Sequence, residues 1–259
     1  MKTALLVYAH PEPTSLTRQL VETAAQALTA DGHTVLRSDL YAMRWKAVFD
    51  ADDFPARQDP ARLSFITESG HAYATQQQTA DVAAEQAKLA AADLVIFQFP
   101  LWWFSMPAIM KGWIERVYAY GLAYGYRNEG NRYRYGDGGL RGKRAVLSVM
   151  VGGPEVDYAP RGINGPLDQL LFPITHGAPF FPGMDVLPTH AIYGTGRITE
   201  ARFAAERDAW RARVARLFDE APIAFRRQNA GDYPDGHQLG DHVAIGQTGI
   251  DAHVAPATR

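Results

Sequence analysis

Three adjacent aromatic residues, Trp102, Trp103 and Phe104, follow an apolar run and lie between Pro100 and Pro107. A flat aromatic ligand is bound best by flat side chains and backbone amides held on one stiff loop. Three consecutive aromatic side chains cannot all point into the core, so at least one of them faces a ligand or another protein chain. We therefore predict a ligand-binding loop here. The alternative is that these aromatics close the core or a contact between subunits.

A second loop, AHPEPTSLT (9–17), also lies between an apolar run and a helical pattern. A pyrophosphate group binds to unpaired backbone N–H groups at the start of a helix and to nearby hydroxyls. Thr14, Ser15 and Thr17 supply hydroxyls, and His10 can add a ring N–H. Neither the G-x-G-x-x-G pattern nor a P-loop occurs here. The alternative is an ordinary helix cap beside a packed histidine.

A third loop, MVGGPEVDYAPRGING (150–165), begins with a glycine pair. Gly152 and Gly153 allow the backbone to approach a ligand closely, and Tyr158 offers a neutral hydrogen-bond donor. The alternative is a glycine-rich turn with a surface tyrosine. Together the three loops support a binding site more strongly than any one of them alone, because each follows an apolar run.

These apolar runs predict five buried strands, and helical patterns separate them. The predicted strands are TALLVYA (3–9), HTVLRSDL (33–40), DLVIFQFP (93–100), RAVLSVMVGG (144–153) and one strand within DVLPTHAIYG (185–194). We interpret the first run as a buried strand and not as a signal peptide. Alternating strands and helices predict a three-layer α/β fold, a doubly wound parallel sheet in the flavodoxin-like order 2-1-3-4-5. This order places a ligand crevice at the carboxyl ends of strands 1 and 3, where all three loops would meet.

The helix after the aromatic loop is predicted to begin at Pro107. Its apolar stripe places Trp113 in the core, whereas Glu115 and Arg116 should face outward as a solvated or intersubunit pair. Residues 41–79 should form a long excursion with a little helix, on the surface or at a subunit contact, and a short helix should lie near 165–171. We expect one domain over residues 1–223 and an extended C-terminal tail of weak structure over 224–259.

Composition excludes several other classes of protein. A net charge of -2 gives no basic surface for nucleic acid, and no apolar window is long enough for a membrane span. The chain has no cysteine, so neither a thiolate nucleophile nor a Cys-based metal site is available. His237 and His242 lack suitably placed carboxylates, and we expect no metal site. The composition is consistent with a reducing cytoplasm, where we expect the protein.

The chain resembles the NAD(P)H:quinone oxidoreductases of the DT-diaphorase type, from residue 1 to about residue 223. The similar stretches are AHPEPTSLT, FPLWWFSMPAIMKGWIERV (99–117), LAYGY (122–126), MVGGPEVDYAPRGING and PFFPGM (179–184). The resemblance implies a flavodoxin-like homodimer with bound FAD, with FMN as a possible replacement. It also implies NADH or NADPH as the hydride donor and a quinone or related small molecule as the acceptor. The implied reaction is a ping-pong, two-electron transfer through the flavin.

The resemblance also assigns roles to residues. The FAD diphosphate and its surroundings would be held by His10, Thr14, Ser15, Leu16 and Thr17. The flavin ring would lie on Pro100, Leu101, Trp102, Trp103 and Phe104, with Trp103 and Phe104 also facing the substrate. The flavin's reactive edge would be bordered by Met150, Val151, Gly152, Gly153 and Tyr158. The substrate would also meet Phe181, and Tyr124 and Tyr126 from the partner subunit.

The chain departs from the family pattern at Asn164, which stands in GING where the family usually has a histidine. Asparagine can donate a hydrogen bond but cannot hold a proton near neutral pH, so a Tyr158–histidine charge relay is in doubt. The catalytic assignment is therefore Tyr158, Asn164, Gly152 and Gly153 as hydrogen-bond donors. Met150 and Val151 replace threonines that often precede the glycine pair.

Two other readings remain open. One is an azoreductase or nitroreductase type of enzyme with FMN or FAD. The other is a non-catalytic flavin-binding subunit of a transport system. A flavodoxin-type electron carrier fits less well, because such carriers are smaller and strongly acidic.

Overall fold

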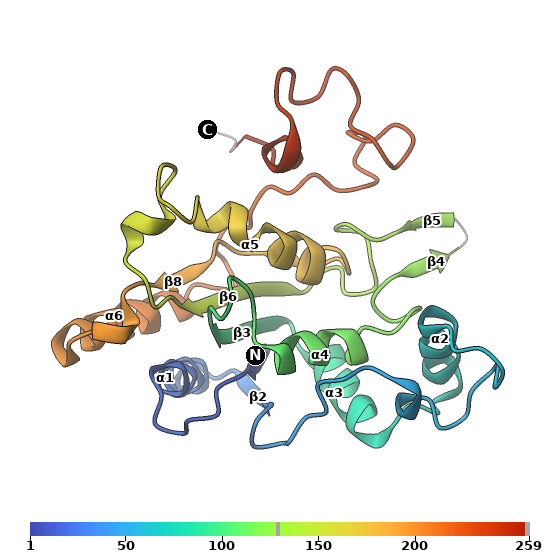
Figure 1. Cartoon of the computed structure of the whole chain (residues 1–259), viewed down its shortest axis with the longest axis horizontal. Coiled ribbons are helices and arrows are strands. Elements are labelled where there is room, and N and C mark those ends of the chain that lie inside the picture. Colours follow the sequence, from blue (N-terminus) through green and yellow to red (C-terminus); the bar gives the residue numbers. More distant parts are fainter. Residues whose placement is uncertain (128–129, 257–259) are drawn as a thin grey trace.

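The computed structural model describes residues 1–127 and 130–256, which form a twisted parallel sheet between layers of helices (Figure 1). The hydrogen-bonded order is β2-β1-β3-β6-β7, and β8 also pairs with β6. Because β7 pairs with the start of β6 and β8 with its end, these two segments together form the fifth strand. The predicted order 2-1-3-4-5 is therefore confirmed. The strands of this sheet are β1 (Thr3–Tyr8), β2 (Thr34–Asp39), β3 (Leu94–Pro100), β6 (Arg144–Met150), β7 (Asp185–Val186) and β8 (His190–Ile192).

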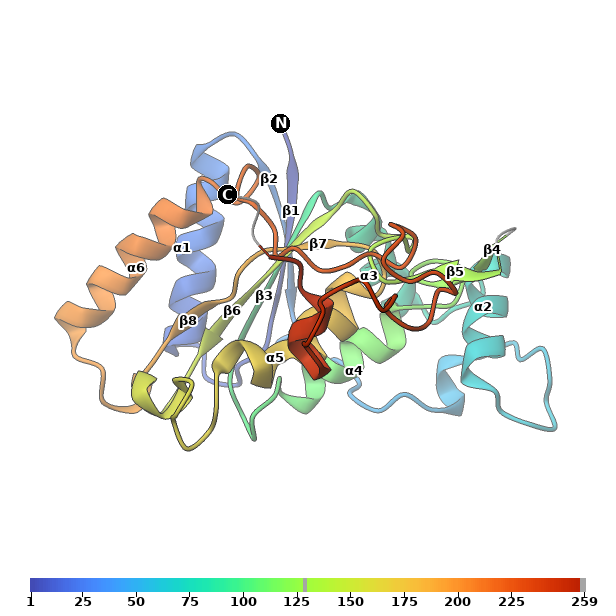
Figure 2. The ribbon, with the colours of Figure 1, turned by 90° about the horizontal axis from the view of Figure 1, so that it is seen from above.

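The helices cover both faces of the sheet, which explains why β3 is buried at every position. Leu20 of α1 and Trp210 of α6 pack on one face, whereas Leu89, Trp113 and Leu171 from α3, α4 and α5 pack on the other. Figure 2 shows α1 and α6 side by side on their face of the sheet. The helices are α1 (Leu16–Ala30), α2 (Phe65–Thr75), α3 (Ala80–Ala91), α4 (Ala108–Val117), α5 (Leu167–Thr175) and α6 (Glu200–Val214).

Local signals account for the helix ends nearest the site. Ser15 caps α1, since its side chain accepts a hydrogen bond from the N–H of Arg18 at 3.3 Å. Gly32 follows α1 with a φ of 78°, a conformation that glycine adopts without strain. Pro107 is the N-cap of α4, so this helix begins one residue later than predicted.

The prediction for Arg116 was wrong. Its side chain is only 2% exposed, and its guanidinium binds Asp53 and Asp81, each at 2.7 Å. It also lies over the ring of Trp45 at 4.3 Å. The helical pattern suggested an outward position because it cannot show that the segment after β2 folds back over α4. Glu115 does remain outward and pairs with Lys111.

Two segments extend beyond the layered core. The loop after α4 carries an antiparallel hairpin of β4 (Gly125–Arg127) and β5 (Gly130–Tyr133). Up to residue 256, the tail after residue 223 consists mostly of turns with one 3₁₀ helix, Gly249–His253, and it passes over α5 (Figure 1). Within the described ranges, no helix combines the length and the apolar character needed to cross a bilayer.

Candidate functional site

A cavity of about 260 Å³ opens at the carboxyl edge of the sheet, between the loops that follow β1, β3, β6 and β8. This is the edge where the winding of the sheet reverses, between β1 and β3. All the lining residues except Thr195 and Gly196 belong to the site that we predicted from the sequence. The cavity is lined by His10, Ser15, Leu16, Thr17, Pro100, Leu101, Trp102, Met150, Gly152, Thr195 and Gly196.

The start of α1 presents hydrogen-bond donors to this cavity. The N–H groups of Leu16 and Thr17 donate to no other group in the described part of the chain. His10 accepts a hydrogen bond at Nδ1 from the N–H of Glu12 at 3.0 Å, so its ring proton lies on Nε2. Unpaired amides at a helix start, together with a ring N–H, form a site suited to an anionic phosphate.

The aromatic loop is a tight turn with an unusual backbone. Trp102 and Ser105 exchange two backbone hydrogen bonds, of 3.0 and 3.1 Å, around the two residues between them. Those residues, Trp103 and Phe104, have φ values of 49° and 60°. Such turns usually carry Asn-Gly, because a left-handed backbone costs a bulky residue about 1–2 kcal/mol. Strain of this kind is typical of a functional site.

The side chains of this turn separate into two groups. Trp102 lines the cavity, and its ring lies 5.9 Å from the ring of His10. Trp103 and Phe104 do not line the cavity, and they are 95% and 51% exposed. Their N–H groups donate no hydrogen bond within the described residues. The turn therefore offers one ring at the cavity, two rings outside its lining and two unused amides.

The glycine-rich loop contributes an opening and a tyrosine. Gly152 lines the cavity, and a Cβ built there would meet no atom within 4 Å. A Cβ on Gly153 would lie 3.3 Å from the ring of Tyr158, so this glycine permits the tyrosine to pack closely. Burial, and then the nearby charge of Asp157, raise the pKa of Tyr158, while a side-chain hydrogen bond with Asn164 opposes the shift. Tyr158 and Asn164 thus lie together, beside the cavity but outside its lining.

Other predicted residues lie away from the cavity. The hydroxyl of Thr14 donates to Glu12 at 2.7 Å. Val151 is buried, and its N–H donates to the carbonyl of Ile192 at 2.8 Å. Tyr124 and Phe181 form a separate aromatic group, with ring centroids 5.5 Å apart. The side chain of Tyr126 lies outside the described residues.

Thr195 and Gly196 were missed by the sequence analysis. Both the hydroxyl and the N–H of Thr195 donate to the carbonyl of Val151, at 3.1 Å each. A Cβ on Gly196 would meet no atom within 4 Å. The signal was available in the Y-G-T-G stretch, because it follows the fifth strand and therefore belongs to the same edge of the sheet.

A row of polar residues crosses the sheet two positions below the cavity. Tyr8, Gln98, Ser148 and His190 are register partners on four neighbouring strands, so their side chains share the face covered by α1 and α6. In the described part of the chain, the buried amide of Gln98 and the buried hydroxyl of Ser148 have no hydrogen-bond partner. Burial, and to a smaller extent the charge of Arg213, lower the pKa of His190 to about 4. The His190 ring stacks on that of Trp210, with ring centroids 4.4 Å apart.

Comparison with known proteins agrees with this architecture. A family profile described as flavodoxin-like fold matches residues 2–214. A ribosyldihydronicotinamide dehydrogenase-like protein of Penicillium crustosum is 46% identical over 232 residues, which are 88% of this chain and 86% of that protein. NAD(P)H dehydrogenase [quinone] 1 of Cavia porcellus is 38% identical over 226 residues, which are 87% of this chain and 80% of that protein.

A solved structure extends the comparison into the tail. A Klebsiella pneumoniae protein, provisionally named a quinone reductase, matches with a TM-score of 0.94 and 50% identity, covering 98% of this chain and all of the other. The tail, which had no visible counterpart in the sequence resemblance, therefore has a structural one. The chain belongs to the flavodoxin-like family of oxidoreductases that includes the NAD(P)H dehydrogenases (quinone).

Proposed function

We propose that this protein reduces quinones with electrons from NADH or NADPH, in a ping-pong reaction through bound FAD. The observation that carries the proposal is the cavity at the winding reversal, where unpaired amides, a glycine opening and an aromatic turn meet. The relatives named quinone dehydrogenases support the same chemistry.

The residues of the cavity fit a flavin nucleotide. The diphosphate would lie at the start of α1, against the N–H groups of Leu16 and Thr17 and the Nε2 proton of His10. A cavity of about 260 Å³ can hold only part of FAD. The flavin ring would extend over the aromatic turn, where the amides of Trp103 and Phe104 are available. When bound, the flavin accepts a hydride from the nicotinamide and passes it to the acceptor.

Tyr158 and Asn164 define what the protein adds at the reactive edge. The raised pKa of Tyr158 keeps its hydroxyl protonated at neutral pH, so it can donate to an oxygen on which negative charge develops. Asn164 can orient that hydroxyl but cannot accept its proton. We therefore propose that Tyr158 stabilises charge and that solvent, not a histidine relay, supplies the proton that the hydroquinone needs.

A second copy of the chain would complete the acceptor pocket. Trp103 is 95% exposed in the single chain, which is unusual for a tryptophan. We propose a homodimer in which Tyr124, Tyr126 and Phe181 of the partner subunit face these exposed rings.

The decisive experiment begins with the purified protein. Chromatography of the released cofactor should identify FAD and would instead reveal FMN if that is the native cofactor. Under anaerobic conditions, NADH or NADPH should bleach the flavin absorption band at about 450 nm, and a soluble naphthoquinone should restore it. A protein that takes up neither flavin would refute the proposal. Flavin binding without bleaching would favour the ancillary-subunit reading, and faster turnover of azo or nitro compounds would favour the reductase alternative.

A further inference from the structure

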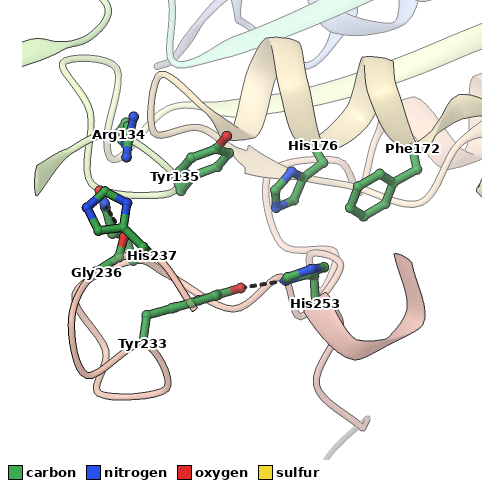
Figure 3. Close-up of a pocket in the computed structure, with 9 residues that line it drawn as sticks. Arg134, Tyr135, Phe172, His176, Tyr233, Gly236, His237 and His253 are labelled. Atoms are coloured by element: carbon green, nitrogen blue, oxygen red, sulfur yellow. Dashed lines mark hydrogen bonds between the residues drawn. The ribbon is translucent and has the colours of Figure 1, made fainter. Parts of the chain in front are cut away.

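A second cavity, of about 450 Å³, lies between the end of α5 and the C-terminal tail. None of its lining residues belongs to the cavity at the carboxyl edge of the sheet. The body of the protein contributes Arg134, Tyr135, Phe172 and His176, and the tail contributes Gln228, Tyr233, Gly236, His237 and His253 (Figure 3). We call it the tail cavity.

Flat rings approach the tail cavity from both sides (Figure 3). On the body side, Phe172 and His176 stack with centroids 4.6 Å apart and planes 12° apart. On the tail side, Tyr233 and His253 are nearly parallel, and the tyrosine hydroxyl lies 2.9 Å from Nδ1 of the histidine. Tyr135 adds a fifth ring, 5.1 Å from that of His176. Ring faces and edges on opposite walls favour a flat aromatic ligand.

The polar side chains that line the tail cavity include several hydrogen-bond donors. Nε2 of His176 is enclosed and has no hydrogen-bond partner in the described part of the chain. Burial, and to a smaller extent the electrostatic effect of His253, lower the pKa of His176 to about 4. The imidazole of His176 is therefore neutral at neutral pH. The guanidinium of Arg134 adds positive charge at 5.5 Å from the ring of Tyr135. The lining includes no acidic side chain among the residues described. A ligand with acceptor oxygens fits this set.

A metal ion does not explain the three histidines. Over the ranges that the structure describes, no three His, Cys, Asp or Glu side chains lie close enough together to hold one. The stacked rings are suited to contact with an aromatic ligand instead.

The walls of the tail cavity are held in place. On the body side, α5 continues into one π-helical turn, His176–Phe180, a conformation often found at functional sites. On the tail side, Arg227 binds Asp185 at 2.6 Å and the carbonyl of Gly136 at 2.8 Å. The cavity therefore exists before any ligand arrives, which lowers the cost of binding.

We propose that the tail cavity binds a flat, two-ring aromatic compound that carries an anionic oxygen, such as an aromatic carboxylate. The size supports two rings, because a cavity of about 150 Å³ already holds benzene. The flat body of the ligand would contact the rings of Phe172, His176 and Tyr233. Its oxygen would accept from the imidazole of His176 within the positive potential of Arg134. Within one chain this site shares no lining residue with the flavin site, and binding there needs no flavin chemistry.

Calorimetric titration of the full-length protein, saturated with FAD, with 2-naphthoate tests this proposal. We expect saturable binding of one 2-naphthoate per chain, at least tenfold tighter than decahydro-2-naphthoate, which has the same carboxylate but no flat rings. His176→Phe keeps a stacked ring but removes the hydrogen bond, and it should weaken binding at least tenfold. Tyr233→Leu should do the same. His242→Leu, at an exposed tail position outside the lining, should bind as the unmodified protein does.

A crystal soaked with 2-naphthoate should show the ligand among His176, Phe172 and Tyr233. The absence of saturable binding would overturn the proposal, as would equal affinity for the saturated analogue. Unchanged affinity in His176→Phe would overturn it too, and this variant decides alone if Tyr233→Leu does not fold. A ligand seen only at the carboxyl edge of the sheet would also refute the tail site.

Discussion

The two cavities of this protein are built in different ways. The cavity at the carboxyl edge lies among loops that follow parallel strands, and its backbone contributes helix-start amides and a glycine opening. The tail cavity is formed by side-chain rings contributed by segments far apart in the sequence. Backbone sites are set by topology and tolerate few substitutions at glycine, whereas ring-lined sites can change specificity through single side chains. The difference teaches that the first cavity follows from the topology of the sheet, whereas the second depends on how the tail packs against α5.

The largest effect we predict is a loss of stability at low pH, because each region contains one largely buried histidine. The pKa values of His190, below the first cavity, and of His176, in the tail cavity, are both lowered to about 4. The unfolded chain takes up these protons near its ordinary pKa of about 6.5, so stability is complete above that pH and is lost as pH falls towards 4. Each histidine should contribute up to about 3 kcal/mol of this loss, less what residual solvent contact removes.

Urea unfolding of the unmodified protein at a series of pH values measures this effect. His176→Phe should remove the part that belongs to the tail cavity and leave the part that belongs to His190. If the variant shows the same pH dependence as the unmodified protein, His176 is not buried as a neutral group.

Gly152→Val should separate the two cavities most directly. The new side chain enters the first cavity without striking the protein, since a Cβ there meets no atom within 4 Å. Overlap with the flavin should weaken its binding by about ten- to a hundredfold, from an overpacking cost of 1–3 kcal/mol. Flavin retention after gel filtration measures the effect. Gly177→Val is the matched control, because a Cβ there also meets no atom within 4 Å but the residue lies beside the tail cavity. Equal flavin loss in both variants would contradict the assignment.

Tyr158→Phe tests the reactive edge alone. Flavin binding should be largely retained, whereas quinone turnover should fall by about tenfold, because a single charge-stabilising donor is lost. Stopped-flow absorbance separates reduction of the flavin from its reoxidation. Asn164→His should keep the fold, and an increase in turnover with a new pH dependence would show that the missing imidazole limits the reaction. Unchanged kinetics in Tyr158→Phe would remove Tyr158 from the mechanism.

The smallest effect we expect is at the aromatic turn. Glycine adopts a left-handed backbone without strain, so Trp103→Gly should be more stable than Trp103→Ala by about 1 kcal/mol. Thermal unfolding measures this difference. Both variants should retain flavin less well than the unmodified protein, by about 1–2 kcal/mol, if the exposed indole covers the flavin ring. Undiminished retention in both would leave Trp102 as the only tryptophan of the turn at the site.

The sequence predicted the first cavity well because its signals are local. A helix cap, a glycine pair and a proline-bracketed turn each follow a strand, and parallel topology brings the ends of neighbouring strands to one edge. Arg116 shows where this reasoning fails. Its burial depends on a segment from after β2 that packs across α4, and no helical period can report that contact. The tail cavity was missed for the same reason, because Phe172 and Tyr233 meet only in the folded chain.

The division of the fifth strand has a consequence for how the protein behaves in a crowded solution. Between β7 and β8, Pro188 has no N–H to offer, so the outer edge of the sheet lacks a continuous row of donors and acceptors. The N–H of Ile223, at the start of the tail, donates a hydrogen bond of 2.7 Å to the carbonyl of Val186, so this carbonyl is already paired. A strand from another molecule would find neither a long nor a free ladder to extend. The interruption that shortens this strand therefore protects this edge of the sheet from pairing with another molecule.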